Sequence, residues 1–185
     1  PRVIPVHQTL LLTAAVSSAV AILLGCASPR KGHDTSTPIS VFASTTGRFA
    51  KGYSWSLAMD ANRKARLTID SYPQARTREF EVGTEQIYEL VAALEKERFF
   101  SLPSDYGQIV PDGSTRVIKV VRDGAEHTVS IHFLMNWVHS NPSKLKEPAR
   151  ALRVFRLVQT WFDDADAVDL SRYDDMVLKA AGNGG

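Results

Sequence analysis

The sequence contains one cysteine, Cys26, and few of the patterns that carry known chemistry. Without a second cysteine the chain cannot form an internal disulfide, so its folded part must be stabilised by packing. Glycine-rich phosphate loops are absent, and the stretch 52–56 (GYSWS) lacks the last glycine of a Gly-x-Ser-x-Gly nucleophile motif. The formal net charge is only +2, which argues against a nucleic-acid partner because such proteins carry a strongly basic face.

Metal-ligand patterns are also missing from the sequence. His127 and His132 are five residues apart in a predicted strand, so they point to opposite faces and do not ligate one ion. We expect His127 to be a partly covered histidine on the core face. The acidic stretch around Asp163 and Asp166 lacks the glycine and the later glutamate of a calcium loop. We therefore predict no metal site, no bound cofactor and no catalytic residue, although a triad of distant residues stays open because triads are spatial.

An uncharged apolar run from about Leu10 to Leu24 leads directly to Cys26. The run is shorter than the roughly 20 residues that a membrane-spanning helix needs, and it fits a secretory signal. The residues Leu23-Leu24-Gly25-Cys26 resemble the lipobox of bacterial lipoproteins. The resemblance implies cleavage between Gly25 and Cys26, a diacylglyceryl group on the Cys26 sulfur, and an N-acyl chain such as palmitate on the new amine. Two or more acyl chains anchor a protein stably, whereas one holds it weakly.

The residue after the cysteine bears on the membrane that is implied. Ala27 stands where an aspartate would resemble the inner-membrane retention signal. The lipobox resemblance therefore implies the periplasmic face of a bacterial outer membrane, with membrane lipid as a partner through Cys26. Two other interpretations of Cys26 stay open, namely the end of an uncleaved membrane helix and part of a plain secretory signal.

Composition divides the chain into four predicted segments. Residues 27–38 are rich in serine, threonine and proline, and such a segment cannot bury enough apolar surface to order itself. The end of this stretch, residues 39–49, either docks onto the domain or stays loose. The predicted segments are a signal peptide (1–25), the lipidated cysteine with a flexible tether (26–50), one α+β domain (51–175) and a disordered tail (176–185).

The periodicity of apolar residues predicts the elements of the domain. Alternation predicts three strands in an antiparallel meander, at 53–59, 65–69 and 76–82. Helical spacing then predicts a helix over 85–98 with Thr84 as its N-cap. Two further strands at 116–122 and 125–133 precede a last helix that Pro148 opens. The predicted fold is an α+β domain of order β-β-β-α-β-β-α, in which an antiparallel sheet of about five strands carries two helices packed on one face.

Asp123-Gly124 between two apolar runs predicts a two-residue hairpin. This turn pairs Arg122 with Ala125 and Val120 with His127. It puts five apolar residues on one face, which we expect to be buried: Ile118, Val120, Val129, Ile131 and Phe133. The hairpin, Glu89-Leu90 in the first helix and the stretch 99–103 (FFSLP) together resemble an uncharacterised domain family of bacterial lipoproteins. That resemblance implies the fold and no activity.

The same hairpin predicts where a site would lie. Because the two strands run in opposite directions, loops 103–114 and 134–147 emerge side by side, opposite the Asp123-Gly124 turn. Together these loops carry the candidate binding patch of Asp105, Tyr106, Asp112, Asn136, Trp137 and His139. Exposed aromatic residues on loops are common at binding sites. The alternative is that Tyr106 and Trp137 merely cover the open end of the core.

Three functional hypotheses follow from the sequence. The first is a non-enzymatic, lipid-anchored module that binds an envelope protein or a cell-wall component. The second is an envelope hydrolase, which a cleft lined by converging titratable groups would favour. The third is a structural subunit of an envelope complex, which a large exposed apolar face would favour. Arg150, Arg153 and Arg156 form a basic stripe on the last helix, either for anionic partners or as an exposed face with local ion pairs.

Overall fold

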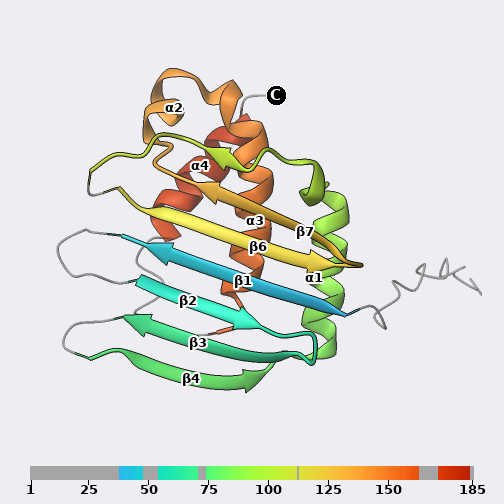
Figure 1. Cartoon of the computed structure of the whole chain (residues 1–185). Coiled ribbons are helices and arrows are strands. Elements are labelled where there is room, and N and C mark those ends of the chain that lie inside the picture. Colours follow the sequence, from blue (N-terminus) through green and yellow to red (C-terminus); the bar gives the residue numbers. More distant parts are fainter. Residues whose placement is uncertain (1–37, 48–53, 71–73, 112, 163–170, 184–185) are drawn as a thin grey trace, which may run out of the picture. The chain divides into compact units, whose positions relative to one another are not determined.

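The computed structural model of the chain describes residues 38–47, 54–70, 74–111, 113–162 and 171–183. The expected signal peptide, the lipobox with Gly25 and Cys26, and Asp112 of the candidate patch lie outside these residues. The described part is an α+β fold built on one mixed sheet of seven strands in the order β4-β3-β2-β1-β6-β7-β5 (Figure 1).

The elements alternate along the chain as strands, a helix, strands and helices. The strands are β1 (Ile39–Thr46), β2 (Ser54–Met59), β3 (Lys64–Asp70), β4 (Arg76–Glu81), β5 (Asp105–Tyr106), β6 (Thr115–Arg122) and β7 (Ala125–Ile131). The helices are α1 (Thr84–Lys96), α2 (Met135–Ser140), α3 (Lys146–Gln159) and α4 (Ser171–Asn183), with short 3-10 helices η1 (Phe99–Ser101) and η2 (Pro142–Leu145).

Strand β1 lies where the sequence predicted a flexible tether. It pairs antiparallel with both β2 and β6, so it is a central strand, and the expected start of the domain near Lys51 is too late. The physical reason is alternation: Ile39, Val41 and Ala43 are buried, while Ser40 and Ser44 between them face the other side. Of the two possibilities that the sequence left for residues 39–49, docking onto the domain is the correct one for β1.

Strand β5 was also not predicted, and it makes the sheet mixed rather than antiparallel. It is only two residues long and pairs parallel with β7, Asp105 with Ser130 and Tyr106 with Ile131. The Ser130 N–H donates to the Ser104 carbonyl at 2.8 Å, and the His132 N–H donates to the Tyr106 carbonyl at 2.8 Å. So short a pairing leaves no alternation in the sequence from which it could be recognised.

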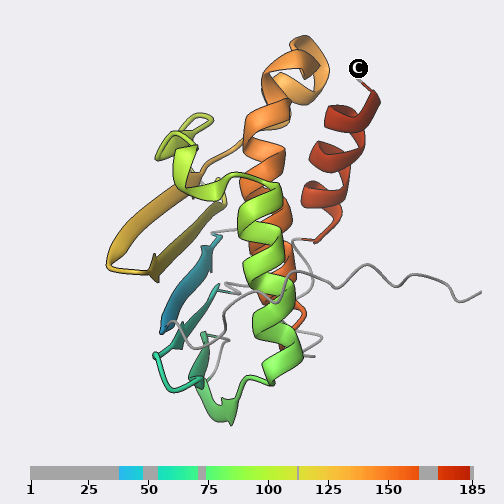
Figure 2. The ribbon, with the colours of Figure 1, turned by 90° about the vertical axis from the view of Figure 1, so that its right-hand side faces the viewer.

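Two helices cover one face of the sheet, as the sequence predicted. Figure 2 shows α1 and α3 side by side across the strands, with α4 on the far side of α3. Helix α4 spans residues for which a disordered tail was predicted, and that prediction is wrong through Asn183. Its Val177 is buried and Leu178 half-buried in the hydrophobic core, which explains why this segment is helical.

The hairpin register is confirmed. Arg122 pairs with Ala125, Val120 with His127 and Ile118 with Val129. Four of the five residues expected on the core face are fully buried, and only Phe133, beyond the end of β7, is half-exposed. Helix α1 begins at Thr84, one residue earlier than predicted: Gly83 is the N-cap, and its N–H donates to Gln86 Oε1 at 2.8 Å. Thr84 instead accepts a hydrogen bond from Arg63 Nη1 at 2.5 Å.

Strand β4 forms one edge of the sheet and is exposed along most of its length. Its sequence RTREFE places two arginines in its first half and two glutamates in its second. Glu79 and Glu81 form ion pairs with Arg66 and Arg63 at 2.7 and 2.9 Å. Charged side chains of this kind are a common feature of free sheet edges, because they oppose pairing with other strands.

Candidate functional site

The two ends of the sheet differ and are named here by their connections. The hairpin end contains the Asp123-Gly124 turn, and the loop end is the opposite one, where β6 begins and β7 ends (Figure 1). At the loop end the two predicted loops do lie side by side. Gln108 bridges to Phe133, and Asn136 Nδ2 donates to Gln108 Oε1 at 3.3 Å.

The structure disperses the residues of the candidate patch. Tyr106 is buried at the end of β5, and burial raises its pKa to about 12, with a smaller contribution from Glu147. Trp137 is half-buried against the core, and the Lys144 ammonium lies 5.8 Å from its ring centroid. Asp105, Asn136 and His139 are exposed. Tyr106 therefore closes the core, as the alternative interpretation held, while the polar members of the patch face solvent.

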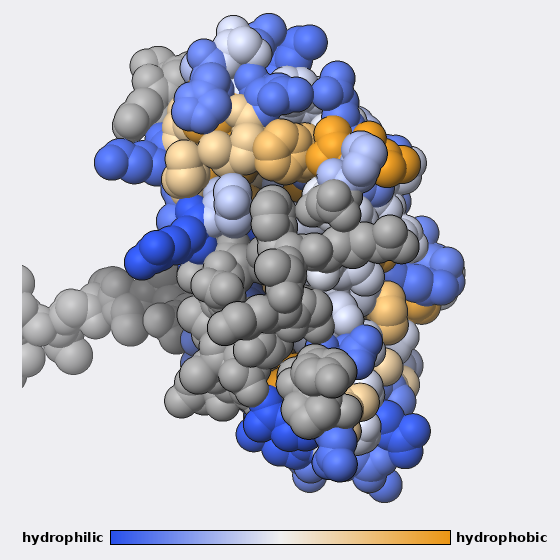
Figure 3. Space-filling model, turned by 90° about the vertical axis from the view of Figure 1, so that its left-hand side faces the viewer, coloured by the Kyte–Doolittle hydropathy of each residue, from blue (hydrophilic) through white to orange (hydrophobic). Residues whose placement is uncertain are grey.

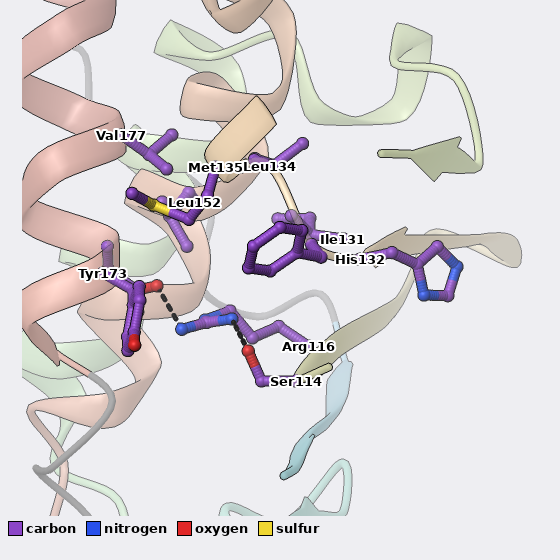
Figure 4. A pocket seen from close by; sticks show the side chains of 11 residues that line it. Ser114, Arg116, Ile131, His132, Leu134, Met135, Leu152, Tyr173 and Val177 are labelled. Carbon is purple, nitrogen blue, oxygen red and sulfur yellow. Dashed lines mark hydrogen bonds and ion pairs between the residues drawn. The ribbon is translucent and has the colours of Figure 1, made fainter. Parts of the chain in front are cut away.

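The loop end contains a small hollow of about 20 Å³ that the patch prediction did not include. Its walls come from the end of β7, the start of α2, α3 and α4 (Figure 4). The apolar lining side chains are Ile131, Phe133, Leu134, Met135, Leu152 and Val177. The polar side chains are those of Ser114, Arg116, Tyr173 and Asp174. The hollow has room for about one water molecule, so a larger partner would contact the surface around it rather than enter it.

An ion pair between β6 and α4 lies in this hollow. Arg116 Nη2 is 2.5 Å from Asp174 Oδ1, and the two side chains are only 5% and 4% exposed. Arg116 Nη1 also donates to Ser114 Oγ at 2.9 Å (Figure 4). Burial raises the pKa of Asp174 above its ordinary value, and Arg116 opposes that shift. Burying two charges costs desolvation that their attraction offsets only in part, so the pair serves specificity more than stability.

The sequence carried one signal for this pair. Arg116 has the same parity in its strand as Ile118 and Val120, so the predicted register already placed it on the buried face. A buried arginine needs an acidic partner. No rule of spacing pointed to Asp174, because the partner lies on a helix that was expected to be tail for most of its length.

A second set of titratable residues lies on the other face of the sheet at the same end. Thr115 Oγ1 is 3.1 Å from His132 Nδ1, and His132 Nε2 is 2.9 Å from Asp105 Oδ1. The ring of His132 points away from the hollow (Figure 4). A hydroxyl, an imidazole and a carboxylate in hydrogen-bonded series match the arrangement of a nucleophile, its base and the group that orients the base. Among the residues described, no three His, Cys, Asp or Glu side chains are grouped to hold a metal ion.

The basic stripe of α3 is taken up by local pairs. Arg153 donates to both carboxylate oxygens of Glu97 at 2.8 Å, and Arg150 donates to the Glu97 main-chain carbonyl. The Glu97 hydrogen bond raises the pKa of Arg153. Arg156 Nη1 is 3.1 Å from Asp175 Oδ1 of α4. These contacts tie α3 to the end of α1 and to α4, which supports the interpretation of the stripe as a face with local ion pairs.

Exposed apolar side chains surround the hollow. Ile109 on the loop before β6 is 81% exposed, and Tyr173 and Met176 of α4 are also exposed. Figure 3, which views this end of the molecule, shows apolar surface in a band between hydrophilic regions. Contiguous exposed apolar surface on a folded domain marks a place where another molecule binds.

Comparison with known proteins adds no assignment: no protein-family model matches the chain, and no curated protein matches it. Of the helices in the described residues, none has both the length and the hydropathy to cross a membrane. The function is therefore argued from the lipobox resemblance and from the geometry of the two ends.

Proposed function

We propose that this protein is a lipid-anchored envelope protein on the periplasmic face of a bacterial outer membrane, whose domain is a non-enzymatic binding module. Leu23-Leu24-Gly25-Cys26 supports the anchor. The loop end is the binding surface, and its partner is an envelope protein or a cell-wall component. The observation that carries the proposal is the apolar surface of the loop end, where Tyr173 and Met176 of α4 are exposed and Ile109, on the loop before β6, is 81% exposed.

The direction of β1 supports this orientation. Ile39 pairs with Arg122, so the chain coming from Cys26 reaches the domain at the hairpin end. The eight residues of β1 then run about 26 Å to the loop end. Residues 27–38 extend to roughly 40 Å at most. An anchor at Cys26 would therefore be joined to the domain at the hairpin end, opposite the loop end where we propose that the partner binds.

The experiment uses a photo-crosslinking amino acid at Ile109 in the native envelope, with palmitate labelling of the same protein. We expect labelled protein and a discrete crosslinked product, because Ile109 is exposed in the apolar band. Met176→Asp, which places a charge in that band, should remove the crosslink. A crosslinker at Tyr88 on the outer face of α1 is the control and should give no such product. Acyl labelling that persists in Cys26→Ser, or equal products from both positions, would contradict the proposal.

One observation favours the alternative of an envelope hydrolase, namely the series Thr115–His132–Asp105. In that case the Thr115 hydroxyl attacks an acyl carbon, His132 takes its proton, and Asp105 orients the ring. An activated ester should then leave an acyl group on Thr115 in the wild type and none in Thr115→Val. A wild-type protein with no acyl adduct would exclude this mechanism and leave the binding module.

A further inference from the structure

A groove of about 460 Å³ lies at the hairpin end, between the end of α1, η1 and the last residue of β6. It is lined by Leu94, Glu95, Arg98, Phe99, Phe100, Ser101 and Arg122. The lining combines two guanidinium groups with an exposed aromatic ring and one carboxylate.

Arg98 is held in an unusual backbone conformation beside this groove. Its φ of 48° is left-handed, a region that residues other than glycine rarely adopt. Two hydrogen bonds fix this turn. The Arg98 N–H donates to the Glu95 carbonyl at 3.1 Å, and Ser101 Oγ donates to the Arg98 carbonyl at 2.8 Å. Its side chain is exposed, and its guanidinium has no ion-pair partner in the described part of the chain. A left-handed residue directly after the C-cap is a common way for a helix to end, and here it fixes the position of Arg98 beside the groove.

Arg122, the second arginine of the groove, forms two ion pairs with long donor–acceptor distances. Its Nη1 is 3.3 Å from Glu95 Oε1, and its Nε is 3.5 Å from Asp123 Oδ2. Arg122 is only 18% exposed, but the carboxylates of Glu95 and Asp123 are 48% and 62% exposed and are free to turn toward solvent. A phosphate that enters the groove can therefore accept hydrogen bonds from Arg122 without breaking a buried pair. Guanidinium groups suit this ligand because their planar forks match phosphate oxygens.

Phe100 gives the groove an apolar edge that faces water. Its ring is 38% exposed and lies edge-on to the fully buried Phe99, 5.8 Å between centroids. An aromatic ring beside arginines is the composition found where proteins contact the boundary between lipid headgroups and acyl chains.

The groove lies at the end of the sheet that the chain from Cys26 reaches first, and this position bears on which ligand it binds. Arg122 pairs with Ile39, the first residue of β1, so the groove lies beside the point where the chain from Cys26 joins the sheet. We propose that this groove binds the phosphate of a membrane lipid headgroup, with Arg98 and Arg122 as its ligands and Phe100 at the acyl boundary. The proposal rests on the lipid anchor proposed for Cys26. It makes the hairpin end a second, non-covalent contact that fixes how the domain stands on the membrane.

The test uses the full lipidated protein in vesicles. Cys26 is the only cysteine and is acylated in that form, so Ser101→Cys supplies one free thiol in the groove for a fluorophore. Ser143→Cys is the matched control, an exposed serine in η2 whose hydroxyl also makes one local hydrogen bond. With spin-labelled lipid headgroups in vesicles that contain phosphatidylglycerol, we expect quenching at residue 101 and little at residue 143. Arg98→Gln should weaken this contact about fivefold, equivalent to about 1 kcal/mol, whereas Arg172→Gln on α4 should not.

The outcomes separate the groove from the anchor. Equal quenching at both labelled positions, or an Arg98→Gln variant that is quenched like the wild type, would overturn the groove proposal while acylated Cys26 leaves the anchor intact. A protein whose mass shows no acyl group on Cys26 would remove the anchor and this inference with it. A fluorescence change caused by inorganic phosphate in detergent without lipid would show a site for soluble anions and would overturn the lipid assignment.

Discussion

The two ends of the sheet are held in different ways. At the hairpin end a two-residue turn joins β6 to β7, and ion pairs such as Lys119–Glu126 at 2.7 Å lie in solvent. At the loop end the ion pair of Arg116 and Asp174 is buried and joins a strand to the last helix. The turn and the Lys119–Glu126 pair join neighbours in the sequence, whereas the buried pair at the loop end joins residues that only the folded domain brings together. A substitution at the loop end should therefore lower the free energy of unfolding more than one at the hairpin end.

The largest expected effect is at the buried pair. Asp174→Ala leaves Arg116 buried without its acidic partner and should lower the free energy of unfolding by about 3–5 kcal/mol, measured by urea denaturation. The control is the next residue, Asp175, whose side chain is 64% exposed and pairs with Arg156. Asp175→Ala should cost less than about 1 kcal/mol. The double variant Arg116→Met/Asp174→Leu should recover most of the loss, because it removes both charges. If both aspartate variants lost the same free energy of unfolding, the buried pair would contribute no more to stability than an exposed pair.

A smaller effect is expected from one glycine at each end. Gly124 of the hairpin turn has φ +75° and open space where a Cβ would stand, so Gly124→Ala should cost about 1–2 kcal/mol from backbone strain alone. Gly107 at the loop end has φ +91°, and a Cβ there would lie 3.0 Å from Leu134 Cδ2 and from the Phe133 carbonyl oxygen. Gly107→Ala should therefore cost more than Gly124→Ala in thermal unfolding. The reverse order would contradict the tighter packing of the loop end.

The sequence predicted best what neighbouring residues determine. The hairpin register followed from Asp123-Gly124, because a two-residue turn leaves one pairing and a one-residue slip would bury Lys119 and Glu126. Helix α1 followed from the spacing of Ile87, Leu90 and Leu94, all of which are buried. Strand β1 was missed because composition was given more weight than alternation. The polar composition of residues 27–38 was extended to residue 50 as a tether, but the partners β2 and β6 bury every second residue of β1.

The sequence predicted at which end of the sheet the candidate site lies, but not which of its side chains are buried. The topology of the hairpin located the loop end, but Tyr106 is turned inward by the parallel pairing of β5 with β7, which no local pattern encodes. The hollow needs α4, and α4 is fixed by contacts such as that of Asp174 with Arg116 across 57 intervening residues. Long-range contacts of this kind cannot be read from periodicity, because their free energy depends on the folded arrangement of both partners.

The charges along β4 have a consequence for molecules crowded together. When two copies of an edge strand join antiparallel about a twofold axis, residues opposite each other share a face of the combined sheet. For the sequence RTREFE, every such alignment sets arginine against arginine or glutamate against glutamate. Like charges therefore meet in each of these pairings, so this border of the sheet opposes the joining of two copies into one larger sheet.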